Sequence, residues 1–375
     1  MVDFSLIGPG PRCTRMLADY GARVVKVRPP GSADLLEAPV HAYSADRDIE
    51  RIGVDLKAPA GLEVADRLVR QASVVVESFR PGVAGRLGIG YERLKTIRPG
   101  IVYCAISGYG QGESAASYPG HDLNYLGVAG YLATSGRDGG GRPALPGSSI
   151  ADAAGGFAAA IAVLAALSAP LRPLEGIYLD VSVTDASLRF TQMFIDRYLA
   201  TGEEVTVGGD QLLGGRACYG VYETSDGKWV TLGALEPRFW RRFCELTGLE
   251  DLVEQQHVEA AQGSVRAAVE AVIRARTRAE WMHLLANEVP VGPVNEISEV
   301  AEDPRLGGGP ATWTVPASDG KNLRQMAPRL AGVPSHLPES SRVPALGSTN
   351  AQAILEEVGY SGNEIATLLR GRVVR

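Results

Sequence analysis

The sequence predicts an α/β protein that consists of a doubly wound parallel sheet and a second, smaller α+β domain. Short β-rich runs alternate with helical stretches up to about residue 185, which is typical of a parallel sheet covered by helices on both faces. The pattern changes near residue 201 to a hairpin that is followed by three helices. The chain has 375 residues, 45% of them hydrophobic, and this length is enough for two domains.

The first half of the chain supplies the elements of the parallel sheet. An apolar run at residues 2–7 stops at Gly8-Pro9-Gly10-Pro11, which marks a tight turn at the start of a helix. Thr184 is placed to cap the last helix of this half. The expected strands are residues 2–7, 23–27, 73–77, 101–106 and 178–183, and the expected helices are residues 12–20, 60–71, 91–97, 150–169 and 185–200.

Residues 220–310 are expected to form the small α+β domain. Strands at 220–224 and 228–233 flank Ser225-Asp226-Gly227, and Asp-Gly supplies the positive φ that a tight hairpin needs. Helices are expected at residues 237–247, 263–276, 278–287, 351–358 and 362–370, and a Pro-, Gly- and Ser-rich connector at 315–348. We expect a large domain at 1–200 that is completed by 330–375, with linkers at 201–219 and 311–329.

Charge and composition exclude several classes of function. The net charge is −6, so a nucleic acid is not an expected partner, because phosphate binding requires a basic surface. The four cysteines are scattered, which predicts neither a zinc site nor a disulfide framework. No signal peptide is evident, and the apolar run at 150–169 is alanine-rich with an early carboxylate, which is typical of a buried helix rather than a membrane span. We expect a soluble, cytoplasmic protein.

The glycines at positions 8 and 10 invite comparison with a dinucleotide-binding fingerprint, because they follow a strand and open a helix. The third glycine of that fingerprint is missing, since Cys13 holds its position. Pro9 and Pro11 also lack the N–H groups that would bind a pyrophosphate. The segment is therefore interpreted as a turn and not as an NAD or FAD site.

Three polar residues stand where predicted elements meet. His121 lies at a loop-to-helix junction just beyond the strand at 101–106, at the end of a sheet where α/β proteins bind ligands. Asp152 falls in the first turn of the alanine-rich helix, and Glu236 directly precedes Pro237, so each also fits a plain helix cap. Taken singly, none of the three identifies a function.

Taken together, these residues and several further motifs resemble the α-methylacyl-CoA racemases, which belong to the wider family III CoA-transferase superfamily. The motifs span nearly the whole chain: Gly-His-Asp-Leu-Asn-Tyr at 120–125, Asp152 before Gly155-Gly156, Gly-Ala-Leu-Glu-Pro-Arg-Phe-Trp at 233–240, Gly-Val-Asp-Leu-Lys at 53–57 and Phe-Arg-Pro-Gly at 79–82. The resemblance implies a Rossmann-like large domain, a smaller α+β domain and an interlocked homodimer.

The resemblance implies the epimerisation of 2-methylacyl-CoA thioesters, with His121 and Asp152 as the two acid/base groups and Asp122 and Glu236 in support. Inverting a carbon next to a thioester requires one group to remove a proton from one face and another to return it to the opposite face. Histidine in the Gly-His-Asp motif favours the racemases, whereas the residues around Asp152 resemble the transferases equally well. A transferase that uses Asp152 as its nucleophile, or a catalytically silent CoA-binding homologue, are the alternatives.

The resemblance also implies that CoA enters as part of the substrate, with no metal and no separate cofactor. Arg80 and Arg86 match arginines near the CoA phosphates, a role that suits the planar guanidinium. Arg28 stands one residue before its expected position, and Ile49 and Glu50 replace a basic pair, so a weaker or rearranged phosphate contact is expected. The other residues expected to bind CoA or substrate are Val54, Asp55, Leu56, Lys57, Gly120, Leu123, Asn124 and Tyr125.

Overall fold

The computed structural model divides the chain into two compact units. It describes residues 1–31, 46–112, 114–169, 176–306, 312–317, 320–328, 330, 332–333, 341–344 and 348–375. Unit 1 consists of Met1–Ala129, Pro146–Phe190 and Pro304–Arg375, and unit 2 of Gly130–Leu145 and Thr191–Asp303. The chain therefore leaves unit 1 twice, and residues 130–145, which the sequence analysis placed in the large domain, group with unit 2.

Unit 1 is built on a six-stranded sheet in the order β3-β2-β1-β4-β5-β6, in which all neighbouring strands are parallel. The strands are β1 (Val2–Asp3), β2 (Val24–Arg28), β3 (Ile49–Gly53), β4 (Val74–Glu77), β5 (Val102–Ser107) and β6 (Ile177–Ser182). This confirms the doubly wound parallel sheet. The sequence analysis did not predict β3, because Glu50 and Arg51 interrupt its apolar residues. The winding direction reverses between β1 and β4, where α/β sheets usually bind ligands.

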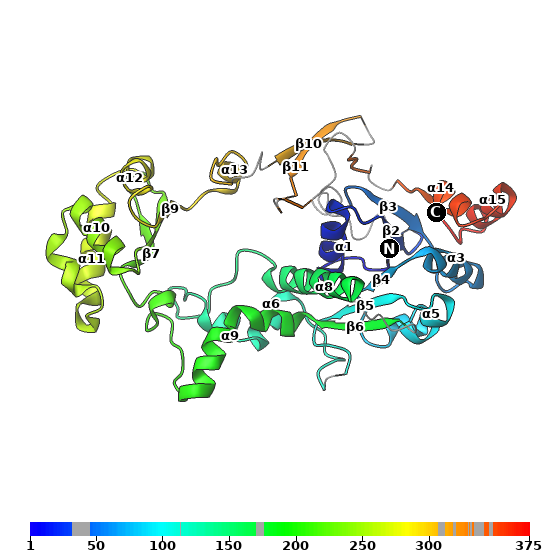
Figure 1. The fold of residues 1–375 in the computed structure, drawn as a ribbon, viewed down its shortest axis with the longest axis horizontal. Coiled ribbons are helices and arrows are strands. Elements are labelled where there is room, and N and C mark those ends of the chain that lie inside the picture. Colours follow the sequence, from blue (N-terminus) through cyan, green and yellow to red (C-terminus); the bar gives the residue numbers. More distant parts are fainter. Residues whose placement is uncertain are drawn as a thin grey trace. The chain divides into compact units, whose positions relative to one another are not determined.

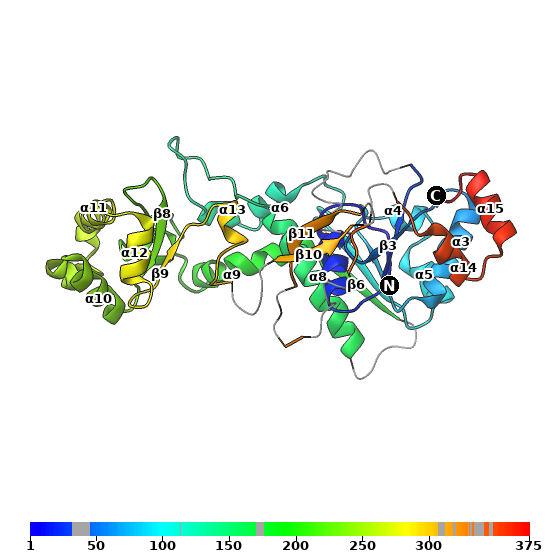
Figure 2. The ribbon, with the colours of Figure 1, turned by 90° about the horizontal axis from the view of Figure 1, so that it is seen from above.

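Helices cover both faces of this sheet (Figure 1). One face carries α1 (Pro9–Asp19) and α8 (Ile150–Ser168), which pack along each other. The other face carries α3 (Pro59–Gln71), α4 (Val83–Arg86) and α5 (Tyr91–Ile97). The two last helices, α14 (Ala351–Glu357) and α15 (Gly362–Arg370), lie beside α3 in Figures 1 and 2 and bury Ile354 and Leu368 in the same core.

The apolar helix α8 has two unlike faces. It is the helix in the described part of the chain that is long and apolar enough to span a membrane. One face, which includes Ala159 and Val163, is buried in unit 1. The other face leaves Phe157, Ile161 and Leu164 exposed by 55%, 68% and 52%. The predicted helix is confirmed, and within the described part of unit 1 one of its faces is buried and the other is exposed.

The helix after β6 begins earlier than expected. α9 runs from Val183 to Thr201, so Thr184 lies inside its first turn and is not the cap that the sequence suggested. The hydroxyl of Ser182 accepts the N–H of Asp185 at 3.1 Å instead. The Thr184 hydroxyl donates to the Gly108 carbonyl at 2.7 Å and so links α9 to the loop after β5.

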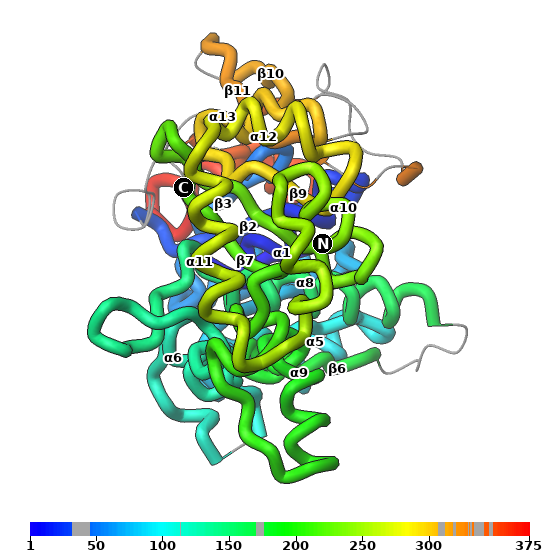
Figure 3. Tube along the Cα trace, turned by 90° about the vertical axis from the view of Figure 1, so that its left-hand side faces the viewer, coloured from blue at the N-terminus to red at the C-terminus, as the bar shows by residue number. Residues whose placement is uncertain are grey.

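Unit 2 contains a three-stranded antiparallel sheet in the order β7-β8-β9, covered on one face by helices (Figure 3). Its elements are β7 (Tyr219–Glu223), β8 (Trp229–Gly233), β9 (Val291–Pro293), α10 (Pro237–Thr247), α11 (Gln262–Ile273), α12 (Arg278–Leu285), α7 (Tyr131–Thr134) and α13 (Ile297–Val300). Short 3-10 helices lie at Gln211–Leu213, Glu250–Gln255 and Glu259–Ala261. The Asp226-Gly227 hairpin turn is confirmed, with φ of 69° at Gly227.

The segment expected to be a connector forms a hairpin in unit 1. β10 (Thr312–Pro316) pairs antiparallel with β11 (Asn322–Met326). Further along, the C-terminal residue joins the sheet edge, because Arg375 and Gly53 exchange both backbone hydrogen bonds at 2.8 and 3.0 Å. The C-terminal segment thus completes the large unit through backbone pairing as well as through helix packing.

Candidate active site

A cavity of about 560 Å³ opens at the carboxyl ends of β1, β4 and β5. Its walls come from the loops after these strands, residues 7–9, 78–81 and 106–108, together with residues 118–125 and the start of α8. All of these segments belong to unit 1. The cavity therefore lies at the reversal point of the sheet, where the parallel topology favours a ligand site.

Asp152 lies in the first turn of α8, and its carboxylate lines this cavity. Its backbone N–H is one of the groups that a helix leaves without an internal partner, and it donates to Oδ1 of Asp122 at 2.8 Å. The positive end of a 19-residue helix stabilises negative charge at this position. Asp122 thus anchors the segment that carries Asp152. Its predicted support of the chemistry stays a prediction.

Arg12 is a site residue that sequence reasoning missed. Its Nη1 lies 3.7 Å from Oδ2 of Asp152 and donates to the Gly8 carbonyl at 3.2 Å. Its Nη2 donates to the Ser149 hydroxyl at 2.5 Å. Its position in the sequence could have indicated this role, because Arg12 lies near the start of the helix that directly follows the glycine turn.

The close approach of α1 and α8 brings these groups together. A Cβ on Gly156 would lie 2.8 Å from Cβ of Arg12 and 3.1 Å from the Pro9 carbonyl oxygen, distances that a side chain does not tolerate. Gly156 therefore allows the two helices to touch at this level. The glycine pair that follows Asp152 in the sequence serves this helix contact.

His121 is the N-cap residue of α6 (Asp122–Val128), and it also lines the cavity. Its N–H donates to Oδ1 of Asn124 at 3.0 Å, and the Asn124 N–H donates back to the His121 carbonyl at 2.8 Å. This exchange fixes the backbone and leaves the imidazole exposed to the cavity. Leu123 and Asn124 follow His121 but are not among the described lining residues.

Tyr125 and Gly120 form the wall beside His121. The Tyr125 hydroxyl donates to the Gly120 carbonyl at 2.6 Å, and a Cβ on Gly120 would lie 2.6 Å from the Tyr125 ring. Burial raises the pKa of Tyr125, so its hydroxyl stays protonated and remains a donor. The predicted residues His121, Asp122, Asp152, Gly120 and Tyr125 therefore share one cavity.

The two predicted phosphate-binding arginines of the loop after β4 are both exposed. Arg80 lines the cavity, whereas Arg86 in α4 is not among its described lining residues. Nη1 of Arg86 lies 3.4 Å from where a Cβ on Gly82 would stand, so the guanidinium lies back over the Phe-Arg-Pro-Gly turn. Arg80 thus lies in the cavity wall, whereas Arg86 lies over the turn that precedes α4.

The segment 54–57 is largely occupied by contacts within the protein. Val54 is 1% exposed and its N–H donates to the Arg28 carbonyl at 2.7 Å. The N–H of Asp55 donates to the Val373 carbonyl at 2.9 Å, while Oδ1 of Asp55 accepts the N–H of Lys57. Leu56 is half-buried, and Lys57 is the exposed side chain of the four. A contact of this segment with CoA stays a prediction.

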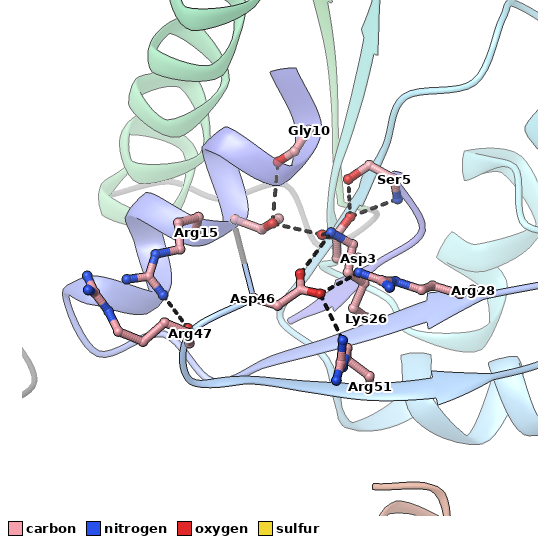
Figure 4. A network of polar contacts seen from close by, with 10 residues as sticks. Asp3, Ser5, Gly10, Arg15, Lys26, Arg28, Asp46, Arg47 and Arg51 are labelled. Atoms are coloured by element: carbon pink, nitrogen blue, oxygen red, sulfur yellow. Dashed lines mark hydrogen bonds and ion pairs between the residues drawn. The ribbon is translucent and has the colours of Figure 1, made fainter. Parts of the chain in front are cut away.

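Arg28 belongs to a buried network at the edge of the sheet (Figure 4). Its Nη2 donates to Oδ2 of Asp46 at 2.5 Å, and Nη1 of Arg51 donates to the same oxygen at 3.3 Å. Oδ1 of Asp46 accepts from Lys26 at 3.4 Å, and Lys26 also lies 3.9 Å from Asp3. The side chains of Lys26 and Asp46 are 1% exposed. Arg28 thus neutralises an internal carboxylate, which the sequence did not indicate.

Glu236 lies in unit 2, as the exposed N-cap residue of α10 before Pro237. This position matches the helix-cap interpretation of its sequence context. Its predicted support of His121 stays a prediction.

Glu77 is a second titratable group that sequence reasoning missed. It ends β4, is 4% exposed, and accepts the N–H of Phe79 at 2.7 Å. Burial raises its pKa to about 7, and the nearby carboxylate of Asp180 adds to this effect. With Tyr103 and Tyr178 it lines another cavity, of about 520 Å³. As the last residue of an apolar strand, it gave no signal beyond its residue type.

Comparison with known proteins places this chain in a family. The model of CoA-transferase family III matches residues 1–350. The chain belongs to CoA-transferase family III. The human alpha-methylacyl-CoA racemase is 31% identical, over 100% of this chain and 96% of its own, and succinyl-CoA–D-citramalate CoA-transferase of Chloroflexus aurantiacus is 29% identical, over 97% and 94%. Membership therefore indicates an enzyme that acts on CoA thioesters.

A solved structure supports the same assignment of the fold. The crystal structure of a CAIB/BAIF family protein from Brucella suis superposes with a TM-score of 0.80 at 25% identity, and covers 95% of this chain and 97% of its own. The predicted family III fold and the resemblance that led to it are confirmed.

Proposed function

We propose that this family III protein is a racemase that inverts the α-carbon of 2-methylacyl-CoA thioesters. The observation that carries the proposal is that His121 and Asp152, one from the start of α6 and one from the start of α8, line the same cavity. Two acid/base groups in one cavity allow a proton to be removed from one face of a carbon and returned to the other. The 31% identity to the human racemase supports the same reaction.

In this mechanism one of the two groups removes the α-proton, and the electron pair moves onto the thioester oxygen to give an enolate. The other group then donates a proton to the opposite face, and the electron pair returns to form the new C–H bond. The positive end of α8 at the cavity favours negative charge there and so suits the enolate. Asp122, which accepts the N–H of Asp152, keeps the start of α8 in position.

CoA transfer with Asp152 as the nucleophile is the second candidate. One specific observation favours it: Arg12, 3.7 Å from Asp152, and the start of α8 both stabilise the ionised carboxylate that a nucleophile requires. The similarity to the CoA-transferase of Chloroflexus aurantiacus, at 29% identity, supports CoA transfer as a candidate reaction. A catalytically silent CoA-binding homologue is the third candidate. In all three candidate functions, Arg80 and Arg86 would bind the CoA phosphates.

A single experiment separates these three functions. One epimer of a 2-methylacyl-CoA is incubated with the enzyme in heavy water, and both inversion and deuterium at the α-carbon are followed. The racemase incorporates deuterium with inversion and needs no acceptor acid. Thioester formation on an added free acid without α-exchange contradicts the racemase and supports the transferase. CoA binding without either reaction supports the silent homologue.

We also propose that the protein associates with a second copy of itself. The exposed apolar face of α8, with Phe157, Ile161 and Leu164, supports this, because soluble proteins rarely leave such a patch in water. Met193 and Leu199 of α9 add exposed apolar side chains, 57% and 75% accessible. Light scattering coupled to gel filtration tests the proposal, and a monomer at micromolar concentration contradicts it.

A further inference from the structure

Arg12 places a positive charge on the wall of the cavity that carries Asp152. Its guanidinium is fixed by two neutral acceptors, the Gly8 carbonyl and the Ser149 hydroxyl, and its side chain is 33% exposed. A guanidinium has five N–H donors, and these two hydrogen bonds use two of them. The 3.7 Å approach to Asp152 is longer than a hydrogen bond. Arg12 therefore keeps donors that a ligand in the cavity can reach.

The position of Arg12 determines which part of a substrate it meets. A group that removes an α-proton stands within about 3–3.5 Å of the reacting carbon. Because Arg12 adjoins Asp152, it lies beside the groups attached to that carbon. The Arg12 guanidinium is thus presented to the acyl part of the thioester.

The chemistry of a guanidinium disfavours a purely aliphatic acyl chain at this place. An alkyl group would exclude water from Arg12 without replacing its hydrogen bonds, which costs free energy. A carboxylate would instead accept two N–H groups in the forked geometry that arginine favours. Arg12 would also offset the repulsion between that carboxylate and Asp152.

We propose that Arg12 selects acyl-CoA substrates whose acyl group carries a second carboxylate, one or two carbons beyond the α-carbon. This inference rests on the proposed function in taking Asp152 as the group that faces the α-carbon and in taking a 2-methyl-branched acyl group as the substrate. It assigns the substrate class: 2-methyl-branched dicarboxylic acids bound to CoA through one carboxyl group. Arg12 acts as a binding residue and carries no proton in the reaction.

The test compares two acyl-CoAs of nearly equal shape. 2-Methylsuccinyl-CoA, linked through the carboxyl next to the methyl branch, carries the free carboxylate, and 2,4-dimethylpentanoyl-CoA replaces that carboxylate with an isopropyl group. Dissociation constants are measured by calorimetry for the wild type and for Arg12→Gln and Arg12→Lys, and α-deuterium exchange is measured in parallel. Arg80→Gln is the matched control, because it removes an arginine from another wall of the same cavity. Circular dichroism verifies the fold of each variant.

The wild type is expected to prefer 2-methylsuccinyl-CoA, and Arg12→Gln is expected to reduce the ratio of the two affinities by about 10–100-fold. Arg12→Lys should retain part of the preference, since it keeps the charge but not the fork. Arg80→Gln should weaken both ligands by the same factor and leave the ratio unchanged. An equal loss of both ligands in Arg12→Gln, or a wild type that prefers the isopropyl compound, overturns the proposal. Binding is measured whether or not exchange occurs, so failure of the racemase function remains distinguishable.

Discussion

Unit 1 contains two clusters of charged side chains that differ in burial and in how closely opposite charges approach. In the network of Figure 4, Lys26 and Asp46 are 1% exposed, and Asp46 accepts from Lys26, Arg28 and Arg51. In the cavity, Arg12 and Asp152 are 33% and 21% exposed and approach no closer than 3.7 Å. The charges of the first cluster are satisfied within the fold, whereas Arg12 of the second cluster keeps N–H donors that a ligand can reach.

This difference teaches how to separate structural from functional charge in the same domain. Buried charges require partners, because an unpaired ion in the interior is costly. A charged side chain at the end of a parallel sheet that keeps free N–H donors and some contact with water does not require such a partner for stability. The two clusters should therefore respond in opposite ways to substitution, one in stability and the other in activity.

The largest effect is expected in the cavity, on activity. His121→Ala should lower racemisation in both directions by about 10²–10⁴-fold, because each direction needs both groups. Asp152 would still remove and return the proton of one epimer, so deuterium exchange without inversion should persist for that epimer. Asp152→Ala should show the opposite preference. The measurement is exchange and inversion of each separate epimer in heavy water.

Two results would break this assignment. Unchanged racemisation in both folded variants removes the pair from the mechanism. Loss of exchange from both epimers in both variants indicates a single shared base. Circular dichroism and the unfolding midpoint serve as controls, since Asp152 also stabilises the first turn of α8.

The next effect is expected in the buried network, on stability. Asp46→Ala would leave Lys26 and Arg51 buried without this carboxylate, and should lower the free energy of unfolding by about 3–5 kcal/mol. Urea unfolding measures this change. Glu63→Ala is the matched control, because it removes a carboxylate from an exposed pair with Arg67 and should change stability little. An equal loss of stability in Asp46→Ala and Glu63→Ala would contradict the structural role of the buried network.

The contrast also shows what the sequence can predict. The alternation of strands and helices was sufficient for the doubly wound sheet, because each element carries its own apolar pattern. β9 and the β10–β11 hairpin were missed, because their strands are short and lie among Gly and Pro residues. His121, Asp122 and Asp152 were found through a motif. Arg12 was not found, because its role depends on the contact between α1 and α8, two helices that are far apart in the sequence.

Glu77 is an intermediate case that sharpens the comparison, because it is buried and the described groups that act on it are the N–H of Phe79 and the carboxylate of Asp180. Its pKa is raised from 4.5 to about 7, so the folded state keeps the proton where the unfolded state has lost it. Stability should therefore fall as pH rises from about 4.5 to 7, by about 3 kcal/mol in total. Below this window both states are protonated and the penalty is absent.

Glu77→Gln tests this expectation, because glutamine does not ionise and can still accept the N–H of Phe79. The variant should be more stable than the wild type at pH 8, and the advantage should shrink toward pH 5. Urea unfolding at four pH values measures both. The exposed substitution Glu92→Gln controls for general charge effects. An identical pH dependence in wild type and Glu77→Gln contradicts the buried-carboxyl interpretation.

The smallest effect is expected for the exposed arginine Arg86, which should alter binding without altering stability. Arg86→Ala should raise KM for acyl-CoA by about tenfold and lower kcat much less, because a lost phosphate contact weakens ground state and transition state alike. Arg70→Ala, at the exposed end of α3, is the control and should change neither constant. The unfolding midpoint should stay the same in both variants, since exposed substitutions rarely alter it. A fall in kcat alone would assign Arg86 to the chemistry, and a fall in stability would place it with the buried network instead.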